Sequence, residues 1–150
     1  IPDMIIRTTF ITGFPGETEE AFTTLSEFVN EAKLDRVGCF AYSREEGTPA
    51  YDFDNQIDEE VKLTRRDELM ELQQEISIDK SSRYVDEVLE VIIEGQAADE
   101  DALYVGRSYM DAPGVDGYVF IKSEEELMSG DFARVRITKA LEYDLIGELI

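Results

Sequence analysis

The sequence predicts an α/β segment followed by a small all-β barrel. Two observations support this prediction. Residues 1–57 contain one strand–helix–strand unit, whereas five short apolar segments follow within residues 81–150, separated by Gly, Pro, Asp and Ser turn signals. With 150 residues, 43% of them hydrophobic, the chain is long enough for one ordinary domain or two small ones with packed cores.

The α/β segment begins with a strand predicted at residues 5–12, a β-branched stretch typical of a buried strand. A glycine-containing turn follows, and Thr18 is the expected N-cap of the next helix. The apolar face of that helix holds Phe22, Leu25, Phe28, Val29 and Ala32. A second strand is predicted over residues 36–42, and a crossover of this kind implies parallel pairing.

Two parallel strands and one helix leave the sheet incompletely covered, and parallel sheets are normally buried on both faces. No further strand–helix alternation follows Tyr42. We therefore expect residues 1–57 to be the end of a larger α/β domain whose beginning lies upstream. The alternative is that this unit packs against the C-terminal half in a compact α+β fold.

A helix is predicted next, over residues 59–77, with Asp58 as its N-cap. In the division into domains, residues 58–76 are assigned to this connecting helix. Because Lys62, Arg65 and Arg66 lie among acidic residues, we expect this helix to be solvated.

The remaining domain is assigned to residues 77–150. Its strands are predicted at residues 87–94, 103–109, 117–121, 132–138 and 144–150. Five short strands in this length predict a closed barrel of the oligonucleotide/oligosaccharide-binding type. Residues 99–101 are expected to form a hairpin tip, and residues 124–126 a solvated loop or short helix.

The charge is strongly negative, with 14 Lys and Arg against 35 Asp and Glu, and a formal net charge of −21. This balance disfavours binding to phosphate backbones, which depends on Lys and Arg, and it favours a basic protein partner. The chain has no His and one Cys, so an ordinary zinc, haem or iron–sulfur site cannot be built from it alone. We expect Cys39 to be a buried thiol, and the chain to be cytoplasmic because it has neither a signal peptide nor a membrane-spanning run.

Two strings are similar to a known family. Residues 10–22 (FITGFPGETEEAF) and residues 40–50 (FAYSREEGTPA) resemble consecutive strand–loop segments late in the barrel of the radical-SAM methylthiotransferases. The C-terminal segment is similar to the TRAM domain that follows this barrel. The resemblance therefore implies a C-terminal remnant of a radical-SAM βα barrel, followed by a five-stranded TRAM barrel.

Within this family, the loop SREEGT at 43–48, the helix segment LMELQQEIS at 69–77 and the segments GRS at 106–108, DAPGVDG at 111–117 and YDL at 143–145 resemble one branch. That branch adds a methylthio group to the β-carbon of an aspartate in the twelfth small-subunit ribosomal protein. The alternatives are the tRNA-modifying branch, with the TRAM domain on RNA, and a non-enzymatic interaction module.

The resemblance also implies S-adenosylmethionine and two 4Fe-4S clusters in the full-length parent, the clusters being held by cysteines upstream of this segment. We therefore expect no catalytic residue and no metal ligand here, and expect the isolated chain to be inactive. Because the parallel strand edges of the remnant are open, we also expect residues 1–57 to promote dimerisation.

The predicted cofactor-facing residues lie at the carboxyl ends of the first two strands. Three glutamates follow the first strand, at the positive end of the helix dipole, and they favour a cation such as a sulfonium over a phosphate. The alternatives are a capped turn without a ligand and a tyrosine that only covers the barrel core. The predicted set is Gly13, Phe14, Pro15, Gly16, Glu17, Tyr42 and Ser43.

In the barrel, Arg134 and Arg136 alternate with apolar residues and are predicted to point outward. Together with Arg107, Tyr109 and Tyr143 they form the predicted substrate-recognition set, of a kind that can bind RNA. Residues 81–150 nevertheless hold six Lys and Arg against sixteen Asp and Glu. This field favours a basic ribosomal protein as the partner over nucleic acid, although carboxylates also serve plain solubility.

Overall fold

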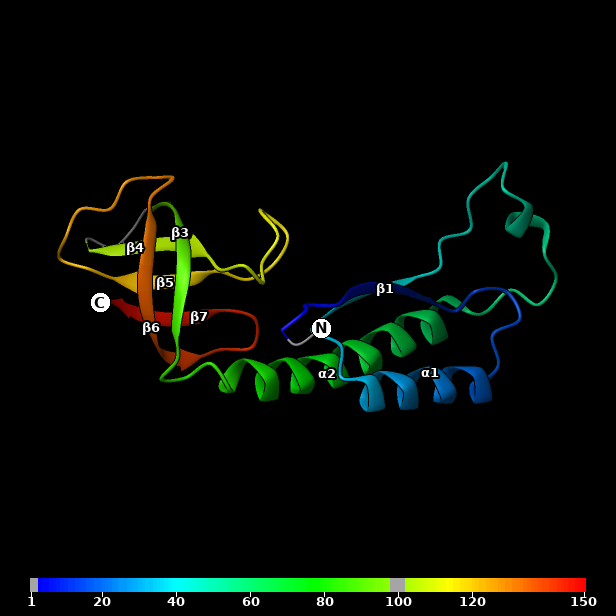
Figure 1. The fold of residues 1–150 in the computed structure, drawn as a ribbon. Coiled ribbons are helices and arrows are strands. Elements are labelled where there is room, and N and C mark those ends of the chain that lie inside the picture. Colours follow the sequence, from blue (N-terminus) through cyan, green and yellow to red (C-terminus); the bar gives the residue numbers. More distant parts are fainter. Residues whose placement is uncertain (1–2, 98–101) are drawn as a thin grey trace. The chain divides into compact units, whose positions relative to one another are not determined.

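The computed structural model describes residues 3–97 and 102–150. The chain divides into two compact units, Ile1–Ile76 and Ser77–Ile150, which Figure 1 shows as an α/β part and a barrel. The hairpin tip predicted at residues 99–101 lies outside the described residues.

The first unit begins with a strand–helix–strand unit made of β1 (Arg7–Thr12), α1 (Glu19–Ala32) and β2 (Arg36–Ala41). The two strands pair in parallel, as predicted, with Phe10 opposite Cys39. The predicted N-cap is confirmed, because the Thr18 hydroxyl accepts a hydrogen bond of 3.1 Å from the amide of Ala21.

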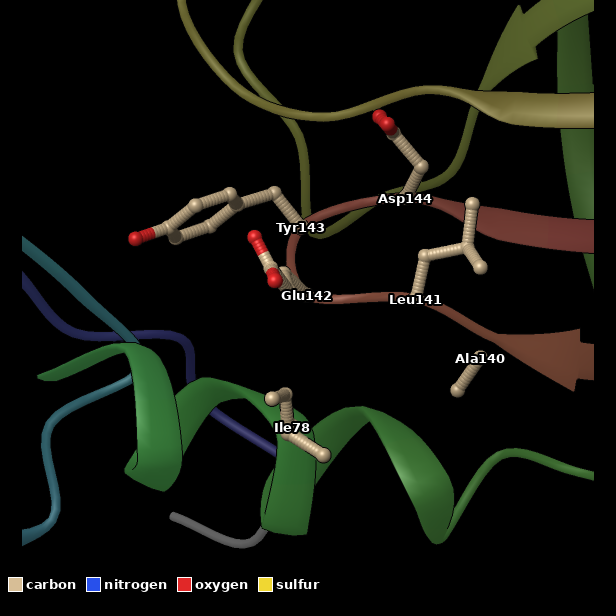
Figure 2. Close-up of a pocket in the computed structure, with 6 residues that line it drawn as sticks. All are labelled: Ile78, Ala140, Leu141, Glu142, Tyr143 and Asp144. Carbon is tan, nitrogen blue, oxygen red and sulfur yellow. The ribbon is translucent and has the colours of Figure 1, made fainter. Parts of the chain in front are cut away.

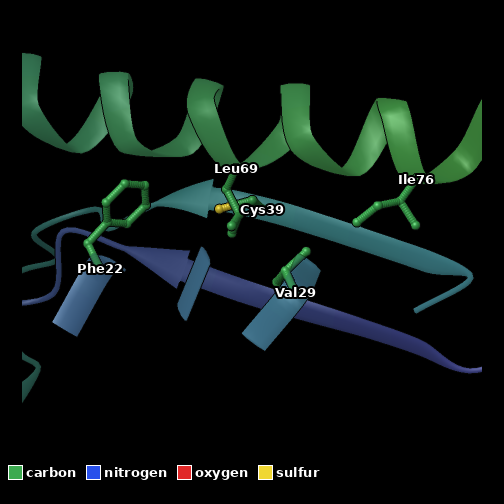
Figure 3. Packing of buried hydrophobic residues seen from close by; sticks show 5 residues of the cluster. All are labelled: Phe22, Val29, Cys39, Leu69 and Ile76. Atoms are coloured by element: carbon green, nitrogen blue, oxygen red, sulfur yellow. The ribbon is translucent and has the colours of Figure 1, made fainter. Parts of the chain in front are cut away.

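A short 3-10 helix, η1 (Pro49–Asp52), precedes α2 (Glu59–Ser82). The expectation of a solvated helix is wrong for α2. Leu69 and Ile76 join the core cluster of Phe22, Val29 and Cys39, and Figure 3 shows these side chains converging between α2, α1 and the sheet. The cations Lys62 and Arg65 are also buried, at 5% and 7% exposure. Burial of this face contributes hydrophobic stabilisation that a solvated helix would lack.

Both helices contribute to the core on one face of the two-stranded sheet, and the opposite face is not covered by the residues that the structure describes. The prediction that the strand at residues 5–12 is buried is therefore wrong for one of its two faces. Its side chains alternate, so that Phe10 packs against the core cluster while Ile11 is 56% exposed. Phe40, opposite Ile11 on β2, is 64% exposed. Successive side chains of this β-branched apolar run thus point alternately to the covered face and to the open face of the sheet.

The second unit is a closed five-stranded barrel, as predicted, with strand order β3-β4-β5-β7-β6. Its strands are β3 (Val88–Gln96), β4 (Leu103–Arg107), β5 (Val119–Lys122), β6 (Phe132–Ala140) and β7 (Leu145–Leu149). Only the β5–β7 pair is parallel. Closure leaves no free sheet edge among the described strands of this unit.

Alternation along β6 defines the inside and outside of the barrel. Val135 and Ile137 are fully buried, whereas Arg134 and Arg136 are exposed, as the sequence predicted. Among the residues that the structure describes, no helix is long and apolar enough to span a bilayer.

Truncation of the α2 face tests its place in the core. We expect Leu69→Ala to lower the free energy of unfolding of the first unit by about 2–5 kcal/mol, because the fully buried side chain leaves a cavity. The matched control is Leu63→Ala on the same helix, where the side chain is 37% exposed. Urea denaturation followed by circular dichroism measures both, and equal losses would contradict this packing.

Candidate functional site

The turn that follows β1 is held in one conformation by hydrogen bonds and close packing. Gly13 has a φ of +74°, and its amide donates to the Glu17 carboxylate over 2.9 Å. A Cβ at Gly13 would lie 2.2 Å from Cγ of Lys62, so only glycine fits between the turn and α2. The amide of Gly16 donates to the carbonyl of Asn55 over 3.0 Å. The turn is therefore preorganised.

A buried ion pair ties this turn to α2. One Arg65 nitrogen lies 2.8 Å from Oε1 of Glu17, and another lies 2.9 Å from Oε2 of Glu19. Burial opposes the charge on Arg65, but its hydrogen bonds to Glu19 and Glu17 outweigh this effect and raise the pKa of the guanidinium above its ordinary value. Oε1 of Glu17 is thus shared between Arg65 and the amide of Gly13.

The structure brings several of the predicted cofactor-facing residues together at the carboxyl ends of β1 and β2. The rings of Phe14 and Tyr42 meet edge to face, 5.2 Å between centroids, and Phe53 packs against Phe14 at 6.1 Å. Ser43 instead donates its hydroxyl proton to Glu45 over 2.5 Å. The hydroxyl oxygen of Tyr42 is buried and has no hydrogen-bond partner among the described residues.

The remaining members of this predicted set are backbone elements of the turn. Pro15 is half-buried and Gly16 exposed, with a φ of +88°. They shape the loop between Gly13 and Glu17.

Sequence reasoning missed the contribution of α2 to this site. The Nζ of Lys62 lies 5.4 Å from the centre of the Tyr42 ring, and Arg65 lies beside it on the same helix face. The available signal was spacing, because residues 62, 65, 69, 73 and 76 recur at intervals of three and four and all are buried. Two cations within such a stripe indicate buried ion pairs.

Cys39 is buried, as predicted, and its sulfur lies 3.9 Å from the Thr12 hydroxyl. Desolvation is the largest influence on this thiol and raises its pKa above the ordinary value. Within residues 3–97 and 102–150, no group of three or more His, Cys, Asp or Glu side chains is arranged to hold a metal ion.

The predicted recognition arginines share the outer face of β4, β3 and β6. Arg134 is opposite Glu90, Arg136 is opposite Glu148, and the Arg107 Nε lies 2.8 Å from the Glu94 carboxylate. Each of these three arginines therefore has an acidic neighbour, which weakens its attraction for phosphate.

The two predicted tyrosines are not part of this face. Tyr109 is 62% exposed in the loop after β4, and Tyr143 lies in the β6–β7 loop, 40% exposed. The predicted recognition set is therefore divided among three places on the barrel.

Comparison with known proteins gives two results. Residues 85–150 match the TRAM domain family. The whole chain is 56% identical to the ribosomal protein uS12 methylthiotransferase RimO of Pelotomaculum thermopropionicum and covers 34% of that protein. Proteins of the same name from a Thermoanaerobacter species and from Clostridioides difficile are 55% and 51% identical over 99% and 100% of the chain. The chain spans about a third of the length of these relatives.

Removal of the Arg65 charge tests the tie between α2 and the turn. We expect Arg65→Gln to destabilise the first unit by about 3 kcal/mol, because it leaves the Glu17 carboxylate buried without its cation. Amide hydrogen exchange at Gly13 should accelerate as well. Arg66→Gln is the control, since its partner Asp67 is exposed and the pair contributes at most about 1 kcal/mol. Unchanged exchange at Gly13 would refute the tie.

The raised pKa of Cys39 predicts slow and pH-dependent alkylation. The native thiol keeps its proton at a pH where the unfolded thiol has lost it, so stability declines as pH rises past about 8.5, the ordinary thiol pKa. We expect iodoacetamide to label the native chain at least about tenfold more slowly than the urea-unfolded chain at pH 8. Equal rates, measured by mass spectrometry, would show that the thiol is accessible.

Proposed function

The chain is homologous to the C-terminal third of the RimO-type uS12 methylthiotransferases and carries a TRAM domain, and we propose that it performs the corresponding tasks in such an enzyme. In this proposal the parent adds a methylthio group to the β-carbon of an aspartate in ribosomal protein uS12, in the cytoplasm. The observation that carries it is the 56% identity along the entire chain to a protein of that name.

The first unit then contributes the last strands of the radical-SAM barrel. Its bare sheet face supports this assignment, because Ile11 and Phe40 require apolar cover that the described residues do not supply. The connecting helix would close the outer layer. The isolated chain would be inactive, and its open strand edges would promote dimers.

The residues of this chain have different relations to the 4Fe-4S clusters and to S-adenosylmethionine, the two kinds of cofactor in the parent. Cys39 is buried in the core, and no group of potential metal ligands is found among the described residues, which supports the proposal that upstream cysteines of the parent hold the 4Fe-4S clusters. S-adenosylmethionine, when bound, supplies the radical and carries a sulfonium cation.

The rim at the ends of β1 and β2 fits a cofactor of this kind. The ring of Phe14 is 44% exposed at this rim and could pack against the sulfonium cation or the adenine, and Tyr42 would hold that ring in place through their edge-to-face contact. Glu17 would act indirectly, by fixing the turn, because Oε1 of its carboxylate is already held by Arg65 and Gly13.

The barrel would recruit the protein substrate. Residues 81–150 hold sixteen acidic against six basic residues, and the arginines on the outer face are interleaved with carboxylates. Such a surface attracts a basic ribosomal protein and repels a polyanion. A second candidate is a tRNA-modifying enzyme of the MiaB type. It is favoured by the outward position of Arg107, Arg134 and Arg136, because arginines on a barrel surface can bind RNA.

Binding measurements separate these two candidates. We expect the 150-residue chain to bind purified uS12 in low salt and to lose at least about tenfold in affinity between 50 and 200 mM salt, because charge attraction is screened. Unmodified tRNA serves as the competing ligand in the same buffers. Sub-micromolar binding to tRNA without binding to uS12, measured by fluorescence anisotropy, would reverse the assignment.

A further inference from the structure

A pocket of about 470 Å³ opens on the barrel unit between the end of α2 and the β6–β7 loop. Figure 2 shows Ile78 on α2 facing this loop, which carries Glu142, Tyr143 and Asp144. Ala140 and Leu141 complete the lining. The lining residues are thus aliphatic, aromatic and acidic, and no Lys or Arg is among them. Of the two acidic residues, Asp144 directs its carboxylate away from Ile78, toward the amide of Tyr118.

The loop that forms one wall is fixed at several points. The Ser77 hydroxyl, itself buried, donates to the Glu142 carbonyl over 2.7 Å, and the Leu141 amide donates to the Asp144 carbonyl over 2.8 Å. The Asp144 carboxylate accepts from the Tyr118 amide over 2.7 Å. A Cβ at Gly117 would lie 1.8 Å from the Tyr143 carbonyl oxygen. A ligand would meet a loop that is already ordered, so binding would cost little further conformational entropy.

The chemistry of the lining selects one class of ligand. An aliphatic stem can cover Ile78 and Leu141, and a cationic head can lie beside the Tyr143 ring and the Glu142 carboxylate. Burial and the Glu142 charge both raise the pKa of the Tyr143 hydroxyl, so the ring stays neutral at physiological pH. Phosphate is disfavoured, because both titratable carboxylates of the lining repel it.

We propose that this pocket, with Glu142 and Tyr143 as its main contacts, binds a lysine or arginine side chain of a basic protein. The proposal rests on the proposed function in one respect, since it identifies that protein with the uS12 substrate. Charge complementarity supports it: two of the lining residues are acidic and none is basic, within a barrel unit that is acidic overall. The pocket would then be a specific contact within an otherwise diffuse attraction.

Matched charge variants test the site against the diffuse field. We expect Glu142→Gln to weaken uS12 binding about three- to fivefold in low salt, and Tyr143→Ala about tenfold. Tyr143→Phe should stay within about twofold of the unaltered chain, because the ring is retained. The control is Glu124→Gln, which removes the same charge from a second acidic pocket that also contains Lys122. Equal weakening by Glu142→Gln and Glu124→Gln would overturn the proposal and leave the proposed function standing.

A small probe tests the pocket independently of uS12. N-acetyl-arginine amide, added to the isotope-labelled 150-residue chain, should shift the amide resonances of residues 141–144, whereas the uncharged isostere N-acetyl-citrulline amide should not. Shifts with the arginine probe but no uS12 binding would retain the pocket and refute the proposed substrate. Absence of arginine-specific shifts at these residues would refute the pocket itself.

Discussion

The buried ion pair between Arg65 and Glu17 is the constraint on which the first unit depends. A charge removed from water must be paired, so α2 is fixed where its guanidinium reaches the start of α1. The position of α2 then decides the rest of the site. Lys62 packs under Gly13 and lies near the Tyr42 ring, and the turn after β1 adopts the conformation that presents Phe14. One electrostatic requirement thereby links the core to the rim.

The sheet of the first unit is ordered, but the described residues cover only one of its faces. Parallel pairing and two packed helices satisfy the backbone and one apolar face, while Ile11 and Phe40 remain in contact with solvent. Exposure of two large apolar side chains on one sheet face is costly in an isolated unit. Apolar cover on this face, as in the proposed function, would remove that cost.

The barrel differs, because closure satisfies every strand edge within the unit itself. Its outer face carries arginines beside carboxylates, and the surplus of acidic residues sets the sign of the surrounding field. Long-range attraction and local specificity are then separate properties. In the proposed function the acidic field would bring a basic partner closer, and ordered features such as the β6–β7 loop would supply the geometry needed for discrimination.

The sequence by itself determined the order of the elements, the parallel pairing of β1 and β2, the closed barrel and the inward and outward sides of β6. These follow from local periodicity, turn residues and caps, all of which act over short distances. It misjudged the first strand and α2, because which face becomes covered depends on partners distant in the chain. Only the tertiary structure placed Arg65 against Glu17, divided the predicted recognition residues among three places, and set Ile78 opposite Tyr143. The spacing of residues 62, 65, 69, 73 and 76 marks the buried face of α2. It does not show which residues tens of positions away contact that face, so packing alone decided those partners.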